Sequence, residues 1–487
     1  MYKSKKTAAA AVCLAGSLLL AGCASADESS EVRLSKNKPV EITIWHYYNG
    51  SQKAAFDALV SEFNDTEGKE TGIYAESHSK GDVSELEAAV ISAAKKEVGS
   101  EEMPNIFSSY ADTAYEVEKS GMLADLTPYF SKEEQAEYVD SYIEEGRIGT
   151  DGELMIFPIA KSTEALMVNK TAWDEFSGAT GVTTEDLKTT EGIARAAEIY
   201  YNWTDAATPD VLYDGKAFYG RDAMANLFII RSMQRGIELF EVNGRTVTLH
   251  ADRDVFKEIW DYYYVPYVKG YFGAYGRFRS DDLKIGKLAA YTGSIASASY
   301  FPDHVEINDV ITPIKCMVLP PPNAEGGDPC IVQQGAGMVV KKGTKEEEYA
   351  SVAFLKWFTE SGRNIEFGCS SGYMPVRKDA GRKEVLDSVI KEKDIKISEK
   401  EYDTQIMAYQ LVNENKTYTY KAFDGGVEAR KILEYDLFDK ANSDRKQVED
   451  GLSTGKTLEE AVGPFISDEE FEKWFEEIKN SLEKCIL

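Results

Sequence analysis

Positive charge is scarce in this sequence of 487 residues, which has 55 lysines and arginines against 83 aspartates and glutamates. The formal charge of −28 would repel a nucleic-acid backbone or an anionic bilayer, so we expect neither as an electrostatic partner. Hydrophobic residues make up 43% of the chain, which is too many for a wholly disordered protein and enough for the cores of at least two domains.

Histidine and cysteine are also rare, and this scarcity excludes several kinds of site. The four histidines show no metal-binding spacing, and the six cysteines match no zinc pattern. A G-x-S-x-G match at 368–372 has no later histidine to complete a hydrolase triad, because the last histidine is His304. We therefore expect no catalytic residue, no metal and no cofactor, and a protein that is not an enzyme.

One cysteine pair is placed for a disulfide. Cys316 and Cys330 flank the proline-rich turn at 319–322, whereas the other pairings lack such a turn. Free buried thiols are the alternative interpretation.

The sequence lacks the run of about 20 apolar residues that a membrane-spanning helix needs. Its N-terminus instead has three lysines, a short apolar stretch that ends at Leu20, and Ala21-Gly22-Cys23. This pattern is typical of a secretory signal and resembles that of bacterial lipoproteins. The resemblance implies removal of residues 1–22, a lipid on Cys23 and anchoring to the outer face of the bacterial cell membrane. A retained short anchor is the alternative.

Residues 23–39 are mostly small and charged, which predicts a flexible tether. From Val40, apolar residues alternate with polar ones as in a strand, and a helical stripe follows at 56–63. Further strands are expected at 73–76, 105–107, 153–159 and 166–169, with helices at 86–94, 171–176 and 350–358, the last stopped by Gly362. Strands that alternate with helices of this length favour an α/β fold with parallel β-α-β units.

Several short elements resemble, in order, those of the maltose-binding-protein-like solute-binding proteins and of their branch that binds glycerol phosphate and sugars. The matching stretches are Pro104–Ile106 with Gly121–Thr127, Phe157–Ala160 with Glu164–Lys170, Ala289–Ser294, Met317–Pro320 with Gly335–Val340, and Ser371–Arg377. Together they extend over about 40–462.

The resemblance implies a two-lobe periplasmic-binding-protein-like fold with hinge strands and a ligand cleft between the lobes. Lobe I would comprise 40–160 and 331–372, and lobe II 161–330 and 373–487. The implied function is capture of a saccharide or polyol and its delivery to the permease of an ABC importer, by a monomer that closes on its ligand.

Candidate ligand-binding residues come first from strand ends, because ligands of open α/β sheets gather beyond the carboxyl ends of the strands. Aromatic faces stack on sugar rings and carboxylates accept bonds from their hydroxyls. These positions are Trp45, His46, Tyr47 and Tyr48 after the first strand, and Glu76 and His78 at the second. For each, a purely structural role in or beside the core is the alternative.

The resemblance supplies further candidates. Glu164 matches a position that gives a carboxylate to the sugar, Ser294 follows the glycine of a turn, and Tyr373 matches the tyrosine of a G-Y-L-P-V segment. Arg430 matches a ligand-binding arginine only loosely, and a solvated helix charge is its alternative role. Trp203 is a second-lobe aromatic candidate.

Two other functions stay open from the sequence alone. A surface-anchored enzyme acting on glycosides would share the export signal and an aromatic cleft. The same fold could instead bind glycerol phosphate, or ferric iron through the phenolates of Tyr47 and Tyr48.

Overall fold

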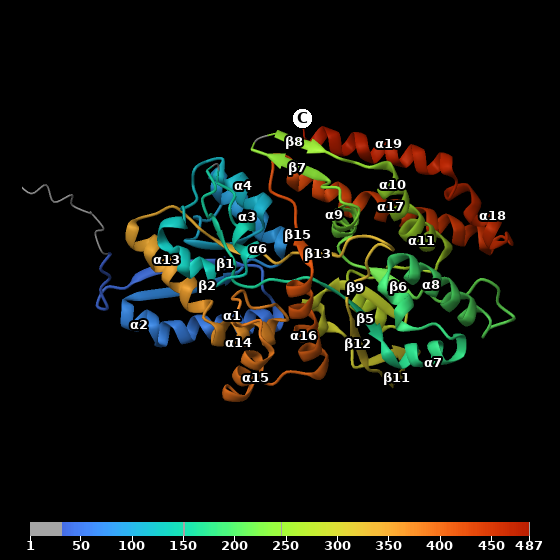
Figure 1. Ribbon diagram of the computed structural model, residues 1–487, viewed down its shortest axis with the longest axis horizontal. Helices are drawn as coiled ribbons and strands as arrows, with labels where there is room; N and C mark the ends of the chain where they lie inside the picture. The colour runs from blue at the N-terminus through green and yellow to red at the C-terminus, as the bar shows by residue number, and fades with distance from the viewer. Residues whose placement is uncertain (1–31, 150, 245, 487) are drawn as a thin grey trace, which may run out of the picture. The chain divides into compact units, whose positions relative to one another are not determined.

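The computed structural model describes residues 32–149, 151–244 and 246–486 (Figure 1). The predicted signal and Cys23 lie outside these residues. The folded unit begins at Leu34, whose side chain packs against the core around the first sheet. Lys36 Nζ lies 2.6 Å from Glu70 Oε2. Leu34 and Lys36, predicted to belong to a flexible tether, therefore contact the folded unit, while residues 35–39 stay exposed.

The first sheet contains five strands in the order β2-β1-β3-β14-β4. β1 is parallel to β2 and β3, whereas β14 is antiparallel to β3 and β4. The strands are β1 (Val40–His46), β2 (Ile73–Ser79), β3 (Ile106–Ser109), β4 (Ile156–Phe157) and β14 (Gly337–Val340). The predicted parallel β-α-β units are confirmed, while the strand expected at 153–159 shortens to Ile156–Phe157.

Helices cover the first sheet through apolar stripes such as Phe56, Leu59, Val60 and Phe63. They are α1 (Gly50–Asp65), α3 (Val83–Lys95), α4 (Ala111–Glu118), α13 (Lys345–Phe358) and α14 (Ser361–Ser371). The expected stop at Gly362 is wrong. α13 ends at Phe358, and Gly362 lies in the first turn of α14, which is preceded by Glu360 in a non-helical conformation (φ −58°, ψ 136°).

The second sheet has the order β12-β5-β9-β6. Its strands are β5 (Glu164–Asn169), β6 (Tyr219–Arg221), β9 (Ala290–Ser294) and β12 (Cys316–Leu319). A large aromatic and aliphatic core joins it to α7 (Lys170–Thr180), α8 (Thr190–Asp205), α9 (Met224–Gln234), α17 (Gly426–Ser453) and α19 (Asp468–Cys485).

Further helices and two hairpins surround these two layers. The helices are α2 (Glu67–Thr71), α5 (Lys132–Ala136), α6 (Asp140–Glu145), α10 (Arg253–Ile259), α11 (Val265–Lys269), α12 (Arg279–Lys284), α15 (Lys383–Glu392), α16 (Glu399–Glu414) and α18 (Leu458–Val462). The hairpins are β7 (Phe240–Asn243) with β8 (Thr246–Leu249), and β10 (His304–Ile307) with β11 (Val310–Pro313). Within the described ranges, no helix is both long and apolar enough to cross a bilayer.

The chain crosses between the two sheets several times, and the crossings lie side by side. Lys161 exchanges backbone hydrogen bonds of 3.0 and 2.7 Å with Met374, and Ser162 exchanges bonds of 2.7 and 3.0 Å with Gln334. β13 (Cys330–Val332) pairs with β15 (Lys416–Tyr418). Two sheets with separate helical layers and adjacent connecting segments form the predicted two-lobe fold.

Candidate ligand-binding site

A cavity of about 390 Å³ lies where helices of the first sheet, helices of the second sheet and the connecting segments meet. The first sheet's side contributes Val83, Ser84, Glu87, Tyr110, Ala111, Asp112 and Glu145. The second sheet's side contributes Ala223, Asn226, Val427, Arg430, Lys431, Glu434 and Tyr435, and the connections contribute Gln333, Gln334, Thr419 and Tyr420. This volume suits a small molecule.

The cavity lies at the topological switch point of the first sheet. From β1, the chain forms β2 on one side and then β3 on the other, so the carboxyl ends of β1 and β3 border a crevice. Tyr110 directly follows β3, and Asp112 lies in the first turn of α4. The position of the cavity is therefore the one at which open α/β sheets bind ligands.

Asp112 lines this cavity with a carboxylate that is only partly hydrogen-bonded. Its Oδ2 accepts a 2.9 Å hydrogen bond from the Tyr420 hydroxyl, while its shielded Oδ1 has no hydrogen-bond partner in the described part of the chain. Burial raises the pKa of Asp112 to about 6. A Cβ at Gly426 would lie 2.5 Å from Oδ1, so α17 approaches this carboxylate closely only because residue 426 is glycine.

Arg430 supplies hydrogen-bond donors. Its Nη2 donates to Asn226 Oδ1 at 2.8 Å, and its guanidinium forms no ion pair with any described residue. Burial opposes its charge, but Tyr420 and Glu434 outweigh this and raise the pKa of Arg430. The guanidinium therefore stays charged and lines the same cavity as Asp112. The hydroxyls of a polyhydroxylated ligand can both accept from a guanidinium and donate to a carboxylate.

The neighbouring charges are largely bound within the protein. Glu145 Oε2 accepts a 2.7 Å bond from the buried Lys161 Nζ. Glu434 Oε2 accepts the Ala225 N–H at the start of α9, at 2.9 Å. Lys431 Nζ pairs with Glu428 at 2.9 Å on the surface. This leaves Asp112, Arg430 and Glu87 as the charged lining groups that can meet a ligand, and burial raises the pKa of Glu87.

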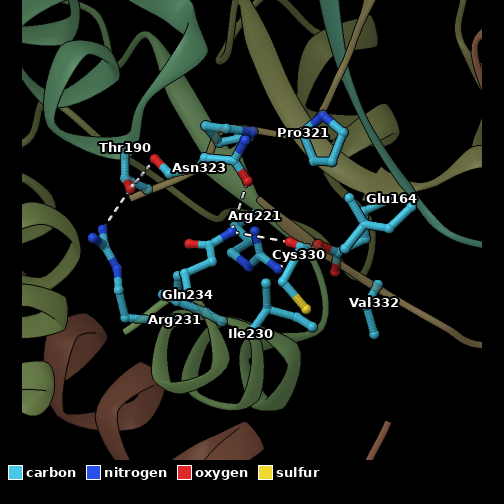
Figure 2. Close-up of a pocket in the computed structure, with 13 residues that line it drawn as sticks. Glu164, Thr190, Arg221, Ile230, Arg231, Gln234, Pro321, Asn323, Cys330 and Val332 are labelled. Atoms are coloured by element: carbon cyan, nitrogen blue, oxygen red, sulfur yellow. Dashed lines mark hydrogen bonds and ion pairs between the residues drawn. The ribbon is translucent and has the colours of Figure 1, made fainter. Parts of the chain in front are cut away.

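Glu164, which the resemblance places against the sugar, is not among the residues that line the cavity. It is 4% exposed, and its Oε2 accepts a 2.6 Å hydrogen bond from Arg221 Nη2 in a buried ion pair. Its Oε1 accepts a 2.9 Å bond from Asn226 Nδ2. Figure 2 shows Glu164 and Arg221 at a second cavity of about 20 Å³, which has room for about one water molecule.

The aromatic residues predicted after β1 are packed in the first core. Trp45 is 4% exposed, and Lys80 Nζ lies 4.0 Å from its ring centroid. His46 is fully buried, which lowers its pKa to about 4. The hydroxyls of Tyr47 and Tyr373 lie 3.4 Å apart.

The other predicted residues lie on the surface, in the second core and at the connections. Glu76 Oε1 and His78 Nε2 lie 3.6 Å apart on exposed positions of β2. Trp203 packs against Phe176 and Tyr200. The Oγ atoms of Ser294 and Ser162 lie 2.8 Å apart. Of the site residues predicted from the sequence, Arg430 alone is among the described residues that line the cavity.

Tyr110, Asp112, Asn226 and Tyr420 line the cavity but were missed by sequence reasoning. Tyr110 and Asp112 could have been found, because they follow the strand expected at 105–107 and ligands gather beyond strand ends. Asn226 and Tyr420 come from distant segments that carry no comparable local pattern.

The described residues offer no support for a metal site. They contain no group of three or more histidine, cysteine, aspartate or glutamate residues that could hold an ion. Burial raises the pKa values of Tyr47 and Tyr48 well above the usual range, which disfavours the phenolates that ferric iron would require. Cys316 and Cys330 are free thiols, as are Cys369 and Cys485.

Three solved structures illustrate how widely this fold matches. The cyclic α-maltosyl-1,6-maltose binding protein of Arthrobacter globiformis aligns with a TM-score of 0.65 and 14% identity, over 92% of this chain and 99% of that one. UgpB of Mycobacterium tuberculosis in complex with glycerophosphocholine aligns with a TM-score of 0.63 and 18% identity, over 92% of this chain and 99% of that one. The ABC substrate-binding protein Lmo0181 of Listeria monocytogenes in complex with cycloalternan aligns with a TM-score of 0.58 and 16% identity, over 91% of this chain and 99% of that one.

Sequence comparison identifies the family. No curated protein sequence matches this chain. The profile of the bacterial extracellular solute-binding proteins matches residues 58–396, which is most of the described chain. This family consists of binding proteins rather than enzymes, and its description implies export from the cell. The chain belongs to the bacterial extracellular solute-binding proteins.

Proposed function

We propose that this protein is the substrate-binding component of an ABC importer and that it captures a saccharide in the cavity of about 390 Å³ between its lobes. The observation that carries the proposal is that Asp112 and Arg430 both line this cavity without an ion pair to a described residue. Asp112 Oδ1 has no hydrogen-bond partner there, and Arg430 Nη2 donates to Asn226. Sugar hydroxyls both donate and accept hydrogen bonds, so neighbouring hydroxyls of one ring can satisfy both groups.

Tyrosines complete the proposed site. Tyr110, Tyr420 and Tyr435 line the cavity, and their faces can pack against the C–H surface of a sugar ring. Two of the structural neighbours named above bind saccharides, which supports the same ligand class. The third binds glycerophosphocholine. A phosphodiester whose phosphate faces Arg430 is therefore the competing ligand.

Ligand capture is proposed to close the lobes about the connecting segments. Lobe I would comprise 40–160 with 331–372, and lobe II 161–330 with 373–487. Contacts from both lobes to one ligand favour the closed form. The radius of gyration measured by solution scattering should fall when a tight ligand is added. An unchanged radius with a saturating ligand would contradict this mechanism.

Anchoring is proposed to rest on Cys23, because the sequence before it resembles a lipoprotein signal. The protein would then act as a monomer tethered to the outer face of the membrane, beside its permease. Mass spectrometry of the N-terminal peptide from the native membrane should find a diacylglyceryl group on Cys23. An unmodified cysteine there would argue against the anchor.

The ligand assignment is tested with a thermal-shift panel of mono-, di- and oligosaccharides, glycerol 3-phosphate and glycerophosphocholine. A compound at 100 times its Kd stabilises the folded state by about 2.7 kcal/mol, which is readily measured. We expect a saccharide to give the largest shift and to be recovered unchanged. A shift with the phosphate compounds alone would reassign the ligand, and conversion of the saccharide to products would identify an enzyme.

A further inference from the structure

We infer that Glu164 is a positioning residue that holds Arg430 in place in the cavity by fixing the side-chain amide of Asn226. The inference rests on the proposed function in one respect: the cavity is taken to be where the solute binds. It assigns Glu164 a role different from direct contact with the ligand, because Asn226 lies between its carboxylate and Arg430.

The hydrogen bonds of Asn226 leave one orientation of its amide. The residue is fully buried, and Nδ2 donates to Glu164 Oε1 at 2.9 Å and to Gln334 Oε1 at 3.0 Å. A carboxylate only accepts hydrogen bonds, so the NH₂ group of Asn226 must face it. The amide oxygen then faces Arg430 Nη2, which donates to it at 2.8 Å.

Gln334 supports the same orientation independently. Its own Nε2 donates to the Thr163 carbonyl oxygen at 3.2 Å, which turns Gln334 Oε1 toward Asn226. If the Asn226 amide were reversed, its oxygen would face two acceptor oxygens and its NH₂ group would face a guanidinium. The reversed amide would therefore lose all three hydrogen bonds.

Glu164 is itself rigidly held. Its second carboxylate oxygen is paired with Arg221 at 2.6 Å, and both side chains are 5% exposed (Figure 2). Glu164 begins β5 and Arg221 ends β6, while α9 starts shortly after β6 and carries Asn226 in its first turn. Two strands and a helix, rather than flexible loops, thus set this arrangement before any ligand arrives.

The arrangement has a consequence for ligand recognition. A free arginine side chain loses rotamer freedom when a ligand immobilises it, whereas an arginine that is already held loses little. In the Glu164→Gln variant, the amide oxygen of the new residue is needed by Arg221, so its NH₂ group would face Asn226 Nδ2 and oppose the orientation that Gln334 still favours. We expect Arg430 to become mobile and affinity for its solute to fall about 2- to 10-fold, the effect of ordering one long side chain.

The test uses the full chain without any ligand, so its outcome is independent of whether saccharide binding is found. [¹⁵N]arginine-labelled protein is examined by NMR, and the guanidinium signals of Arg430 are assigned by their loss in Arg430→Lys. We expect resolved Nη–H signals for Arg430 in the wild type and their loss by exchange in Glu164→Gln.

Glu191→Gln is the matched control. Glu191 forms a similarly buried ion pair with Arg231, at 2.8 Å in the same lobe, and the hydrogen bonds of the Asn226 side chain to described residues involve neither of them. The Glu191→Gln variant should lose stability as Glu164→Gln does, but the NMR signals of Arg430 should remain resolved. If Glu164→Gln does not fold, Glu164→Leu with Arg221→Met removes the ion pair as a unit, a change that buried pairs often tolerate. Resolved Arg430 signals in either folded Glu164 variant, or their loss in Glu191→Gln, would overturn the inference.

Discussion

Asp112→Asn should stabilise the protein at neutral pH while weakening its ligand binding. An aspartate ordinarily has a pKa of 3.8, and burial raises the pKa of Asp112 to about 6. Between these values the unfolded chain has released the proton and the folded protein still holds it, so stability falls as the pH rises from about 4 to about 6. This loss of stability persists above pH 6, because both states are then ionised.

The magnitude follows from the two pKa values. A difference between 3.8 and about 6 corresponds to about 3 kcal/mol of unfolding free energy. An asparagine does not ionise and can still accept the Tyr420 hydroxyl bond. The variant should therefore match the wild type near pH 4 and exceed its unfolding free energy by up to about 3 kcal/mol at pH 7.5. Urea unfolding followed by circular dichroism at both pH values measures this difference.

Affinity should change in the opposite direction. Removing the charged acceptor costs about 1.5–3 kcal/mol of binding, the usual contribution of a hydrogen bond to a charged group. Calorimetric titration with the saccharide found in the thermal-shift panel measures this loss.

Asp222→Asn is the control for this prediction. Burial also raises the pKa of Asp222 to about 6, but the residue does not line the cavity as Asp112 does. This variant should also gain stability above pH 6 and should keep its affinity. A pH-independent stability difference for Asp112→Asn, or unchanged affinity, would refute the reasoning about the buried carboxylate.

Three further substitutions separate binding residues from structural ones. Arg430→Met should weaken saccharide binding by about 1.5–3 kcal/mol in calorimetry, and undiminished affinity would remove Arg430 from the site. Arg277→Ala removes a 2.9 Å ion pair to Asp82, which joins the second sheet's side to the start of α3. Because this pair is exposed, affinity should fall by less than about fivefold and the difference should vanish in high salt; a loss that persists there would indicate direct contact. Trp45→Ala should lower the unfolding free energy by about 3–5 kcal/mol and leave affinity intact. Weaker binding by a folded variant would show that Trp45 contacts the ligand after all.

The residues at the carboxyl end of β1 could not be assigned to the site from local sequence alone. The rule that ligands gather beyond strand ends selected Trp45, His46, Tyr47 and Tyr48, yet these side chains are buried. The reason is tertiary: Tyr48 packs edge-on against Phe367 of α14, with ring centroids 5.3 Å apart. No pattern near Trp45 indicates that a helix more than 300 residues later covers this strand end.

The fold itself was largely readable because its signals are local. The alternation of apolar residues in β1 and the stripe of α1 depend on neighbours within a few positions, and the structure confirms both elements. Ordered short motifs then indicated the two-lobe family. The predicted bounds of an element were wrong where tertiary contacts compete with the local periodicity. The strand expected at 153–159, for example, is only Ile156–Phe157 (β4) in the structure.

The sequence by itself determined the alternation of strands and helices and the family to which the chain belongs, because periodicity and short motifs are properties of adjacent residues. Only the tertiary structure decided which side chains form the cavity. Glu164, Asn226 and Arg430 come from three separate stretches of the chain and acquire their roles through hydrogen bonds that exist only after β5, α9 and α17 have packed together.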